Sequence, residues 1–145
     1  MKLDIKKLKD KAIIPSFGTE YSAGADLYAC IDENVTIKPG ETKLIPTGLA
    51  MAIPEGYGGF IYARSGLASK RGLAPANKVG VVDADYRGEV MVALYNQSSE
   101  EQTIDVNERI AQLVIAPFLK FEFNEVDELD ETVRGTGGFG STGTK

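Results

Sequence analysis

The chain of 145 residues has 16 basic and 21 acidic residues, a net charge of −5, no histidine and one cysteine. This length suffices for a single domain with its own core, and the acidic balance argues against a protein that binds nucleic acid or a membrane surface through a basic field. Without histidine, or a second cysteine beside Cys30, the chain lacks a Ser-His-Asp or Cys-His apparatus, a histidine ligand for zinc and an intrachain disulfide.

The first ten residues, MKLDIKKLKD, are charged throughout, so we expect no secretory leader there. No later segment approaches the roughly 18 consecutive apolar residues of a membrane span. We therefore predict a soluble, cytoplasmic protein whose chemistry depends on carboxylates, hydroxyls, basic side chains and a hard cation such as Mg²⁺.

Short apolar runs separated by Gly, Pro, Asn and Asp dominate the chain, and few apolar residues recur at helical spacing. This pattern predicts an all-β fold, a jelly-roll-like sandwich or barrel. Pro and Gly at 38–40 and 54–56 are typical of reverse turns. The expected strands are 25–31, 35–37, 41–46, 49–53, 57–63, 78–82, 89–96, 102–106 and 110–117.

Two polar residues stand out within the apolar runs. Asp26 lies in the segment SAGADLY at 22–28, where it either faces a metal or caps a turn. Gln112 lies in the expected strand 110–117, and hydrogen bonding within the core is the default explanation for such a residue.

One short helix is predicted at 66–71, after Ser65 and ended by Gly72. At its start, Arg64 offers a planar fork of donors, Ser65 a hydroxyl and Gly66 an unshielded backbone N–H. These groups suit phosphate oxygens, although an Arg-Ser-Gly tripeptide is more often a plain strand end.

The segment 79–91, VGVVDADYRGEVM, predicts a β-hairpin with a polar apex. In a functional interpretation, Asp83 at the end of a rigid arm orients or deprotonates a water molecule. In a structural interpretation, Asp and Gly are ordinary turn residues and Tyr86 is a cross-strand packing residue. The segment alone leaves the two evenly balanced.

The composition changes near the end, first to an acidic stretch at 124–131 and then to RGTGGFGSTGTK at 134–145. We predict a β domain over residues 1–133 and a mobile tail over 134–145, because five glycines and one aromatic residue bury too little to offset the cost of ordering. A disordered end is the plainer interpretation of that composition. The other is an anion-binding loop in which glycines expose backbone N–H groups beside Arg134, Phe139 and Ser141.

The order of these segments resembles the trimeric dUTPase family. Its five motifs appear as SAGADLYA at 22–29, ARSGLA at 63–68, GVVDADYRG at 80–88, RIAQLV at 109–114 and RGTGGFGSTG at 134–143. The resemblance spans nearly the whole chain. It implies hydrolysis of dUTP to dUMP and pyrophosphate, which limits uracil in DNA and supplies dUMP for thymidylate synthesis.

The resemblance also implies roles for individual residues. Asp83 holds the water that attacks the α-phosphorus in line, and Tyr86 packs under the deoxyribose so that a 2′-hydroxyl does not fit. A carboxylate is a weak base at neutral pH, so positioning and charge stabilisation should supply most of the rate. The uracil pairs with main-chain groups of the hairpin, near Asn77, Val81, Val82, Asp83 and Met91.

The triphosphate, by the same resemblance, is held by Arg64, Ser65, Gly66 and Gln112. Mg²⁺ bridges the phosphates, with Asp26 acting on it through water. The tail closes over the active site, where Phe139 stacks on the uracil and the neighbouring groups approach the phosphates. The tail residues concerned are Arg134, Phe139, Gly140 and Ser141. The family is homotrimeric, and each site takes parts from three chains.

Two rival functions remain. The dCTP deaminases have a related fold but a different hairpin motif and a glutamate as proton shuttle, whereas this hairpin carries Asp83, Asp85 and Tyr86. A nucleotide-sensing binder without enzymatic activity is the second rival, and the complete hairpin and tail motifs argue against it.

Overall fold

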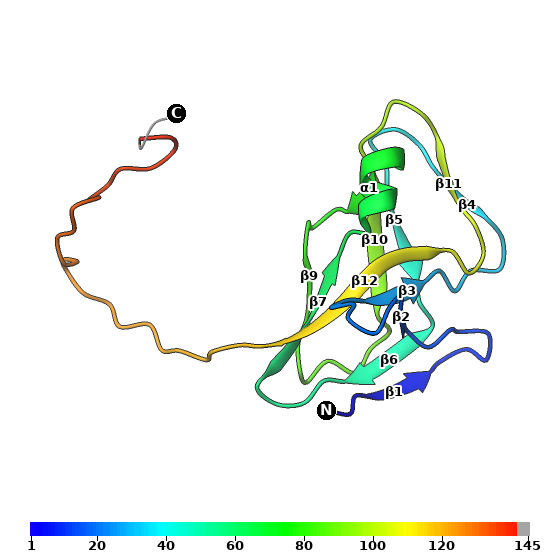
Figure 1. The fold of residues 1–145 in the computed structure, drawn as a ribbon, viewed down its shortest axis with the longest axis horizontal. Helices are drawn as coiled ribbons and strands as arrows, with labels where there is room; N and C mark the ends of the chain where they lie inside the picture. Colours follow the sequence, from blue (N-terminus) through cyan, green and yellow to red (C-terminus); the bar gives the residue numbers. More distant parts are fainter. Residues whose placement is uncertain (142–145) are drawn as a thin grey trace.

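A computed structural model describes residues 1–141. Apart from one short helix, the regular secondary structure of the body is β strand joined by turns and loops (Figure 1), as the apolar alternation predicted. The strands are β1 (Asp4–Lys7), β2 (Ser16–Phe17), β3 (Ala25–Tyr28), β4 (Val35–Ile37), β5 (Thr42–Pro46), β6 (Leu49–Ala52), β7 (Tyr57–Tyr62), β8 (Leu73–Pro75), β9 (Gly80–Val82), β10 (Met91–Asn96), β11 (Gln102–Ile104) and β12 (Arg109–Pro117).

The strands pair antiparallel throughout. A five-stranded sheet has the order β2-β3-β12-β7-β9 and a three-stranded sheet the order β5-β10-β8, while β1-β6 and β4-β11 form two-stranded ribbons. One apolar cluster joins the two larger sheets, since Leu27 and Leu113 of the first pack in the same core as Ile45 and Leu94 of the second. The chain is thus a sandwich-like β domain around one large core, with a small second cluster of Ala12, Cys30 and Leu49.

Three strands, β1, β2 and β8, lie outside the expected strand ranges. The first two are largely exposed and carry little apolar alternation, so pairing with a neighbour, rather than their own pattern, makes them strands. The third, β8, has only three residues between the helix and a turn. Edge strands of this kind depend on the tertiary fold more than on propensity.

The helix α1 (Ser65–Arg71) confirms the sequence prediction to within one residue. Leu67 is its buried residue, and Gly72 ends it in the left-handed conformation with φ of 65°. Gly72 also donates its N–H to the Ala68 carbonyl at 3.2 Å, which closes the last turn.

The predicted hairpin over 79–91 is wrong in its pairing. β9 pairs with β7 in the five-stranded sheet, whereas β10 pairs with β5 and β8 in the other sheet. The loop 83–90 therefore connects the two sheets. The strands on either side of it, β9 and β10, pack in the same apolar core but do not pair with each other. Periodicity shows which residues face the core, but not which partner each strand takes.

The C-terminal segment leaves the body after β12 and extends away from it (Figure 1). Residues 118–141 form no helix or strand. Their described backbone hydrogen bonds include one from the Phe118 N–H to the Gly56 carbonyl at the base, and three turns between residues 132 and 141. Residues 142–145 of the predicted tail lie outside the described residues. Within residues 1–141, no helix is long and apolar enough to cross a membrane.

Candidate active site

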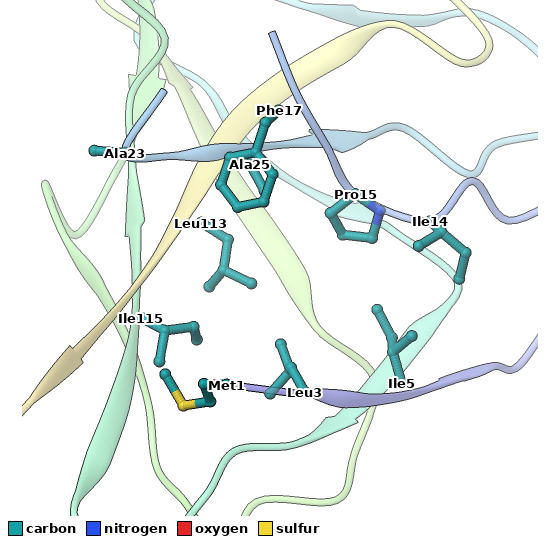
Figure 2. Close-up of a pocket in the computed structure, with 10 residues that line it drawn as sticks. All are labelled: Met1, Leu3, Ile5, Ile14, Pro15, Phe17, Ala23, Ala25, Leu113 and Ile115. Carbon is teal, nitrogen blue, oxygen red and sulfur yellow. The ribbon is translucent and has the colours of Figure 1, made fainter. Parts of the chain in front are cut away.

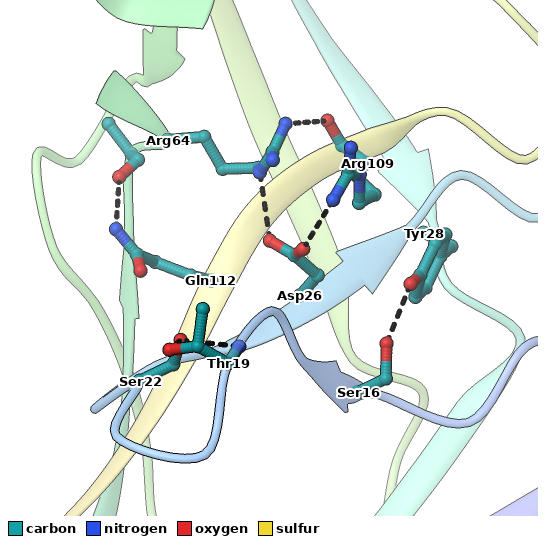
Figure 3. A network of polar contacts seen from close by, with 9 residues as sticks. Ser16, Thr19, Ser22, Asp26, Tyr28, Arg64, Arg109 and Gln112 are labelled. Atoms are coloured by element: carbon teal, nitrogen blue, oxygen red, sulfur yellow. Dashed lines mark hydrogen bonds and ion pairs between the residues drawn. The ribbon is translucent and has the colours of Figure 1, made fainter. Parts of the chain in front are cut away.

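A polar hollow of about 410 Å³ opens between the start of α1 and the strands β3 and β12. It gathers four residues that the sequence singled out for phosphate binding, Arg64, Ser65, Gly66 and Gln112, together with Asp26. Gly18, Ser22, Ala23, Gly24 and Arg109 complete its lining. The hollow thus brings three of the five sequence motifs to one place (Figure 3).

Asp26 organises the cationic side of this hollow. Its Oδ1 accepts from Arg64 Nε at 2.8 Å and its Oδ2 accepts from Arg109 at 3.2 Å. The Asp26 side chain is 14% exposed, against 25% for Arg64 and 51% for Arg109. Two guanidinium groups therefore share one carboxylate, which leaves a local positive excess in a protein of net charge −5.

A β-bulge explains how Arg109 and Gln112 reach the same hollow. Residues three apart on a regular strand point to opposite faces. The pairing of β12 with β3 shifts by one residue between Arg109 and Ala111, and the consecutive residues Ile110 and Ala111 are both buried. This extra residue turns Arg109 to the side of Gln112, as bulges commonly re-aim a side chain.

Gln112 is held by its neighbours on both sides. Its Nε2 donates to the Ala63 carbonyl at 2.9 Å, and its amide lies so close to Gly24 that a Cβ there would be 2.5 Å from the Gln112 Oε1. A glycine is therefore required at position 24. Because Ala63 precedes Arg64, the bond also fixes the strand end that carries Arg64.

The start of α1 offers free donors to the hollow. Arg64 occupies the N-cap position with extended backbone, and its side chain makes no cap hydrogen bond. The backbone N–H groups of the first turn have no partner within an α-helix. Ser65 and Gly66 are exposed, and no atom lies within 4 Å of the position a Gly66 Cβ would take. An oxygen-rich ligand can approach this backbone closely.

Arg109 is the residue that the sequence argument missed. It lies in the motif RIAQLV, but only Gln112 of that motif was expected in the site. The usable signal was the pair of consecutive apolar residues after Arg109, because strict alternation would have separated it from Gln112.

Asp83 lies at a second hollow, of about 760 Å³. It follows β9 directly and is exposed. The lining of this hollow is Glu55, Gly56, Asp83, Ala84, Asp85, Arg87, Phe118 and Lys120. The base of the C-terminal tail therefore borders the same hollow as Asp83.

The two hollows lie at opposite ends of β7. Val82 of β9 pairs with Gly59, and the chain runs from Gly59 up β7 to Arg64 at the polar hollow. At about 3.3 Å per residue, the backbone at Asp83 is roughly 20 Å from that at Arg64 within one chain. A single chain thus separates the expected water-binding carboxylate from the expected phosphate-binding groups.

The residues expected around the uracil and sugar lie on several elements. Val81 is 65% exposed on β9, while the Val82 side chain is buried, so its main chain is the available part. Asn77 is exposed in the turn before β9, and Met91 pairs with Pro46 in the other sheet. Tyr86 is 46% exposed, and its hydroxyl donates to the Glu89 carbonyl at 3.0 Å.

The tail residues lie away from both hollows (Figure 1). Arg134 Nε donates to the Gly137 carbonyl at 2.8 Å, the Ser141 N–H donates to the Gly138 carbonyl at 3.0 Å, and the Phe139 side chain is fully exposed. Gly140 has a positive φ of 91°. Within one chain, the structure does not bring these residues to the other expected site residues.

Fold and site together define a β-sandwich protein with a polar hollow lined by two arginines, a glutamine and the start of a short helix. Residues 10–143 match the dUTPase family. The chain belongs to the dUTPase family.

Individual relatives agree with this assignment. The deoxyuridine 5'-triphosphate nucleotidohydrolase of Desulfitobacterium hafniense is 56% identical over 137 residues, which cover 93% of this chain and 91% of that protein. A mutant dUTPase of Staphylococcus bacteriophage 80alpha with dUpNHpp superposes with a TM-score of 0.86 at 31% identity, covering 98% of each chain. A mutant dUTPase of phage phi11 of S. aureus, in which the coordination of a structural Mg(II) ion is described, has a TM-score of 0.77 at 28% identity and covers 88% of this chain and 98% of that one.

Proposed function

We propose that this protein hydrolyses dUTP to dUMP and pyrophosphate by in-line attack of a water on the α-phosphorus. A bond forms between the water oxygen and the α-phosphorus, while the bond from that phosphorus to the bridging oxygen of the β-phosphate breaks. Asp83 orients the water and accepts its proton, and pyrophosphate leaves. The reaction limits uracil incorporation into DNA and supplies dUMP for thymidylate synthesis.

The polar hollow carries this proposal. Arg64 and Arg109 share Asp26, and Gln112, Ser65 and the free backbone of α1 face the same space. Because these donors are held before any ligand arrives, they stabilise phosphate charge without reorganising. The triphosphate carries the negative charge of dUTP. A chain of net charge −5 therefore binds it through a local cluster of arginines and hydrogen-bond donors.

The uracil pairs with the edge of the five-stranded sheet. β9 is the last strand of that sheet, so one side of its main chain is left without a strand partner within residues 1–141. Main-chain donors and acceptors of Val81, Val82 and Asp83 match the uracil edge, with Asn77 and Met91 at its border. A wrong base leaves buried polar groups unpaired, which makes the discrimination strong. Tyr86 packs against the deoxyribose.

Mg²⁺ is the proposed cofactor. Residues 1–141 contain no group of three acidic or cysteine side chains placed to hold a metal, and both Asp26 oxygens already accept from arginines. Asp26 would therefore hold Mg²⁺ only indirectly, through a water, which suits an ion that usually retains several waters. When bound, such an ion would supply neutralisation of the phosphate charge.

A homotrimer with shared sites accounts for the separation of the two hollows. The Asp83 hollow of one chain, the polar hollow of a second and the tail of a third together supply every expected contact. Such sharing would bring together Asp83 and Arg64, whose backbones lie roughly 20 Å apart in one chain. The tail then closes over the substrate with Arg134, Phe139, Gly140 and Ser141.

The exposed tail and an apolar hollow support association between copies. A hollow of about 400 Å³ is lined by Leu3, Ile5, Phe17, Leu113 and other apolar side chains, which are drawn in Figure 2. Phe121 and Phe123, in the segment that leads from β12 to the tail, are 69% and 90% exposed. Residues 122–131 have six acidic residues, while residues 1–11, which include Met1, Leu3 and Ile5 of the lining, have five lysines and two aspartates. The C-terminal segment of another copy therefore matches this hollow in hydrophobicity, and the N-terminal segment beside the hollow has the opposite net charge.

We assign the protein to the cytoplasm because its one cysteine is a free, buried thiol.

A pyrophosphate-release assay with dUTP, dCTP, dTTP and UTP in the presence of Mg²⁺ tests the activity. Pyrophosphate from dUTP with little from the other three is the expected result. Ammonia released from dCTP would indicate a deaminase instead. Tight binding of dUTP without pyrophosphate release would indicate a nucleotide sensor.

A further inference from the structure

Arg71, at the last residue of α1, makes three contacts beyond the helix. Its Nε donates to Gln102 Oε1 at 3.1 Å, one terminal nitrogen pairs with the Glu108 carboxylate and the other donates to the Thr103 carbonyl. The side chains of Arg71 and Glu108 are 30% and 19% exposed. Every side of the guanidinium fork is thus occupied by β11 or by the turn that follows it.

Glu108 connects this contact to the start of β12. Its second carboxylate oxygen accepts from the Asp105 N–H at 2.9 Å, and its carbonyl accepts from the Ala29 N–H at 2.8 Å. The residue that follows it is Arg109, one of the two arginines on Asp26. Arg71 therefore holds the segment from which Arg109 projects.

The two ends of α1 serve the same hollow in different ways. Arg64 and Ser65 at its beginning line the hollow directly, while Arg71 at its end, about 10 Å along the helix axis, grips the turn before Arg109. Arg64 also donates to the Arg109 carbonyl at 3.5 Å. The distance between the guanidinium groups of Arg64 and Arg109 therefore depends on how α1 packs against the start of β12.

We propose that Arg71 is a positioning residue for the triphosphate site, acting through Glu108 on Arg109. The inference rests on the proposed function for its substrate, and the contacts themselves belong to this chain. Among residues 1–141, none of the side-chain hydrogen-bond partners of Arg71 lines the polar hollow. Loss of its fork lets the turn 105–108 and the Arg109 side chain shift, and a small misplacement of charge-stabilising groups is costly.

A purely structural role of Arg71 predicts a different experimental result. If Arg71 only stabilises the fold, its loss lowers the melting temperature and the folded fraction, while the folded molecules bind phosphate normally. A positioning role weakens phosphate binding in protein that is fully folded. The affinity for inorganic pyrophosphate with Mg²⁺ separates the two, because this probe needs the hollow but neither the uracil nor the hydrolytic step.

The variants are Arg71→Lys, Arg71→Met and Glu108→Gln, with Lys70→Met as the matched control. Lys70 is the preceding residue in the same helical turn and is exposed, so its replacement removes the same charge without touching the fork. Arg71→Lys keeps the positive charge and loses the planar set of donors. It therefore provides a second test of the role of Arg71 if Arg71→Met folds poorly.

Pyrophosphate affinity is measured by calorimetry well below each melting temperature, with KM and kcat for dUTP measured alongside. We expect all three variants to bind pyrophosphate about tenfold to a hundredfold more weakly, with a matching rise in KM. Lys70→Met should keep the wild-type values. The double variant Arg71→Met with Glu108→Gln should lose little more than Arg71→Met alone, since both changes disrupt the same ion pair between Arg71 and Glu108.

Unchanged pyrophosphate affinity and KM in folded Arg71→Lys and Arg71→Met protein would overturn the inference and leave a purely structural role. Equal losses in Lys70→Met would overturn it as well, because they would reflect charge alone. Wild-type protein that binds pyrophosphate but does not cleave dUTP would refute the proposed function instead, and the pyrophosphate comparison would still decide the role of Arg71.

Discussion

The polar hollow and the C-terminal tail carry similar side chains, arginine and serine beside glycine, yet they differ in what holds them. In the hollow, Arg64 and Arg109 are fixed by Asp26, and Gln112 by a main-chain carbonyl. In the tail, the hydrogen bonds of Arg134 within residues 1–141 are local: its Nε donates to the Gly137 carbonyl, and its own carbonyl accepts from the Gly137 N–H. The hollow is therefore organised without a ligand, whereas no contact with the β domain holds Arg134 within the described residues.

The Asp83 hollow lies between these extremes, because its carboxylate follows a strand but faces solvent. The largest expected effect is from Asp83→Asn, which keeps the size of the side chain and removes the carboxylate proposed to accept a proton from the water. We expect kcat to fall by about 10²- to 10⁴-fold with little change in KM. Stopped-flow pyrophosphate release measures both constants.

Glu55→Gln is the matched control for that experiment, since Glu55 borders the same hollow from another turn. It should retain the wild-type kcat. Wild-type turnover in Asp83→Asn would contradict the role given to that carboxylate.

Removal of the tail after Thr132 tests the comparison between hollow and tail directly. We expect kcat to fall about 100-fold, because charge-stabilising donors to the substrate are lost. The melting temperature should stay nearly the same, because the tail side chains are mostly exposed. Calorimetric unfolding together with steady-state kinetics measures the two effects, and a large fall in melting temperature would mean that the tail is structural.

Tyr86→Ala should have a smaller effect, on sugar choice. Without the ring, the preference for dUTP over UTP in kcat/KM should narrow by about tenfold or more. Tyr86→Phe is the control, since it keeps the ring and loses only the hydroxyl bond to the Glu89 carbonyl. Unchanged rejection of UTP by Tyr86→Ala would show that another group reads the sugar.

The smallest effect is expected at Asp32, whose pairing contrasts with that of Asp26. The pKa of Asp32 is lowered from the ordinary value of 3.8, chiefly by the side-chain hydrogen bond from Lys11 and then by the charge of that lysine. A carboxyl whose pKa is lower in the folded state stabilises the fold above its unfolded pKa, and this contribution is lost as the pH falls through the folded pKa.

Asp32→Asn should therefore lower the melting temperature only slightly at pH 7, and the difference should vanish in acid below the folded pKa of Asp32. The pair is exposed, with 89% of the Asp32 side chain accessible, and exposed pairs contribute little. Asp26, at 14%, is the opposite case. A large effect of Asp32→Asn at pH 7 would contradict this distinction.

Much of the fold was predictable because it depends on local patterns. Alternating apolar residues located nine of the strands, and Gly72 ended α1 where expected because it adopts a positive φ. The strands β1 and β2 were missed because their few residues are mostly exposed and owe their pairing to β6 and β3. Contacts with residues distant in the sequence make these two segments strands, and the residues of the segments themselves do not reveal such contacts.

The amino-acid sequence by itself determined the all-β class, the turns, the short helix and the five motifs that place the chain among the dUTPases. Tertiary structure alone decided that 79–91 crosses between sheets, that Arg109 and Arg64 meet at Asp26, and that Asp83 lies far from Arg64 within one chain. The reason is physical: side-chain periodicity and turn chemistry act over a few residues, whereas strand partners, register and the meeting of distant charges depend on the packing of the whole chain.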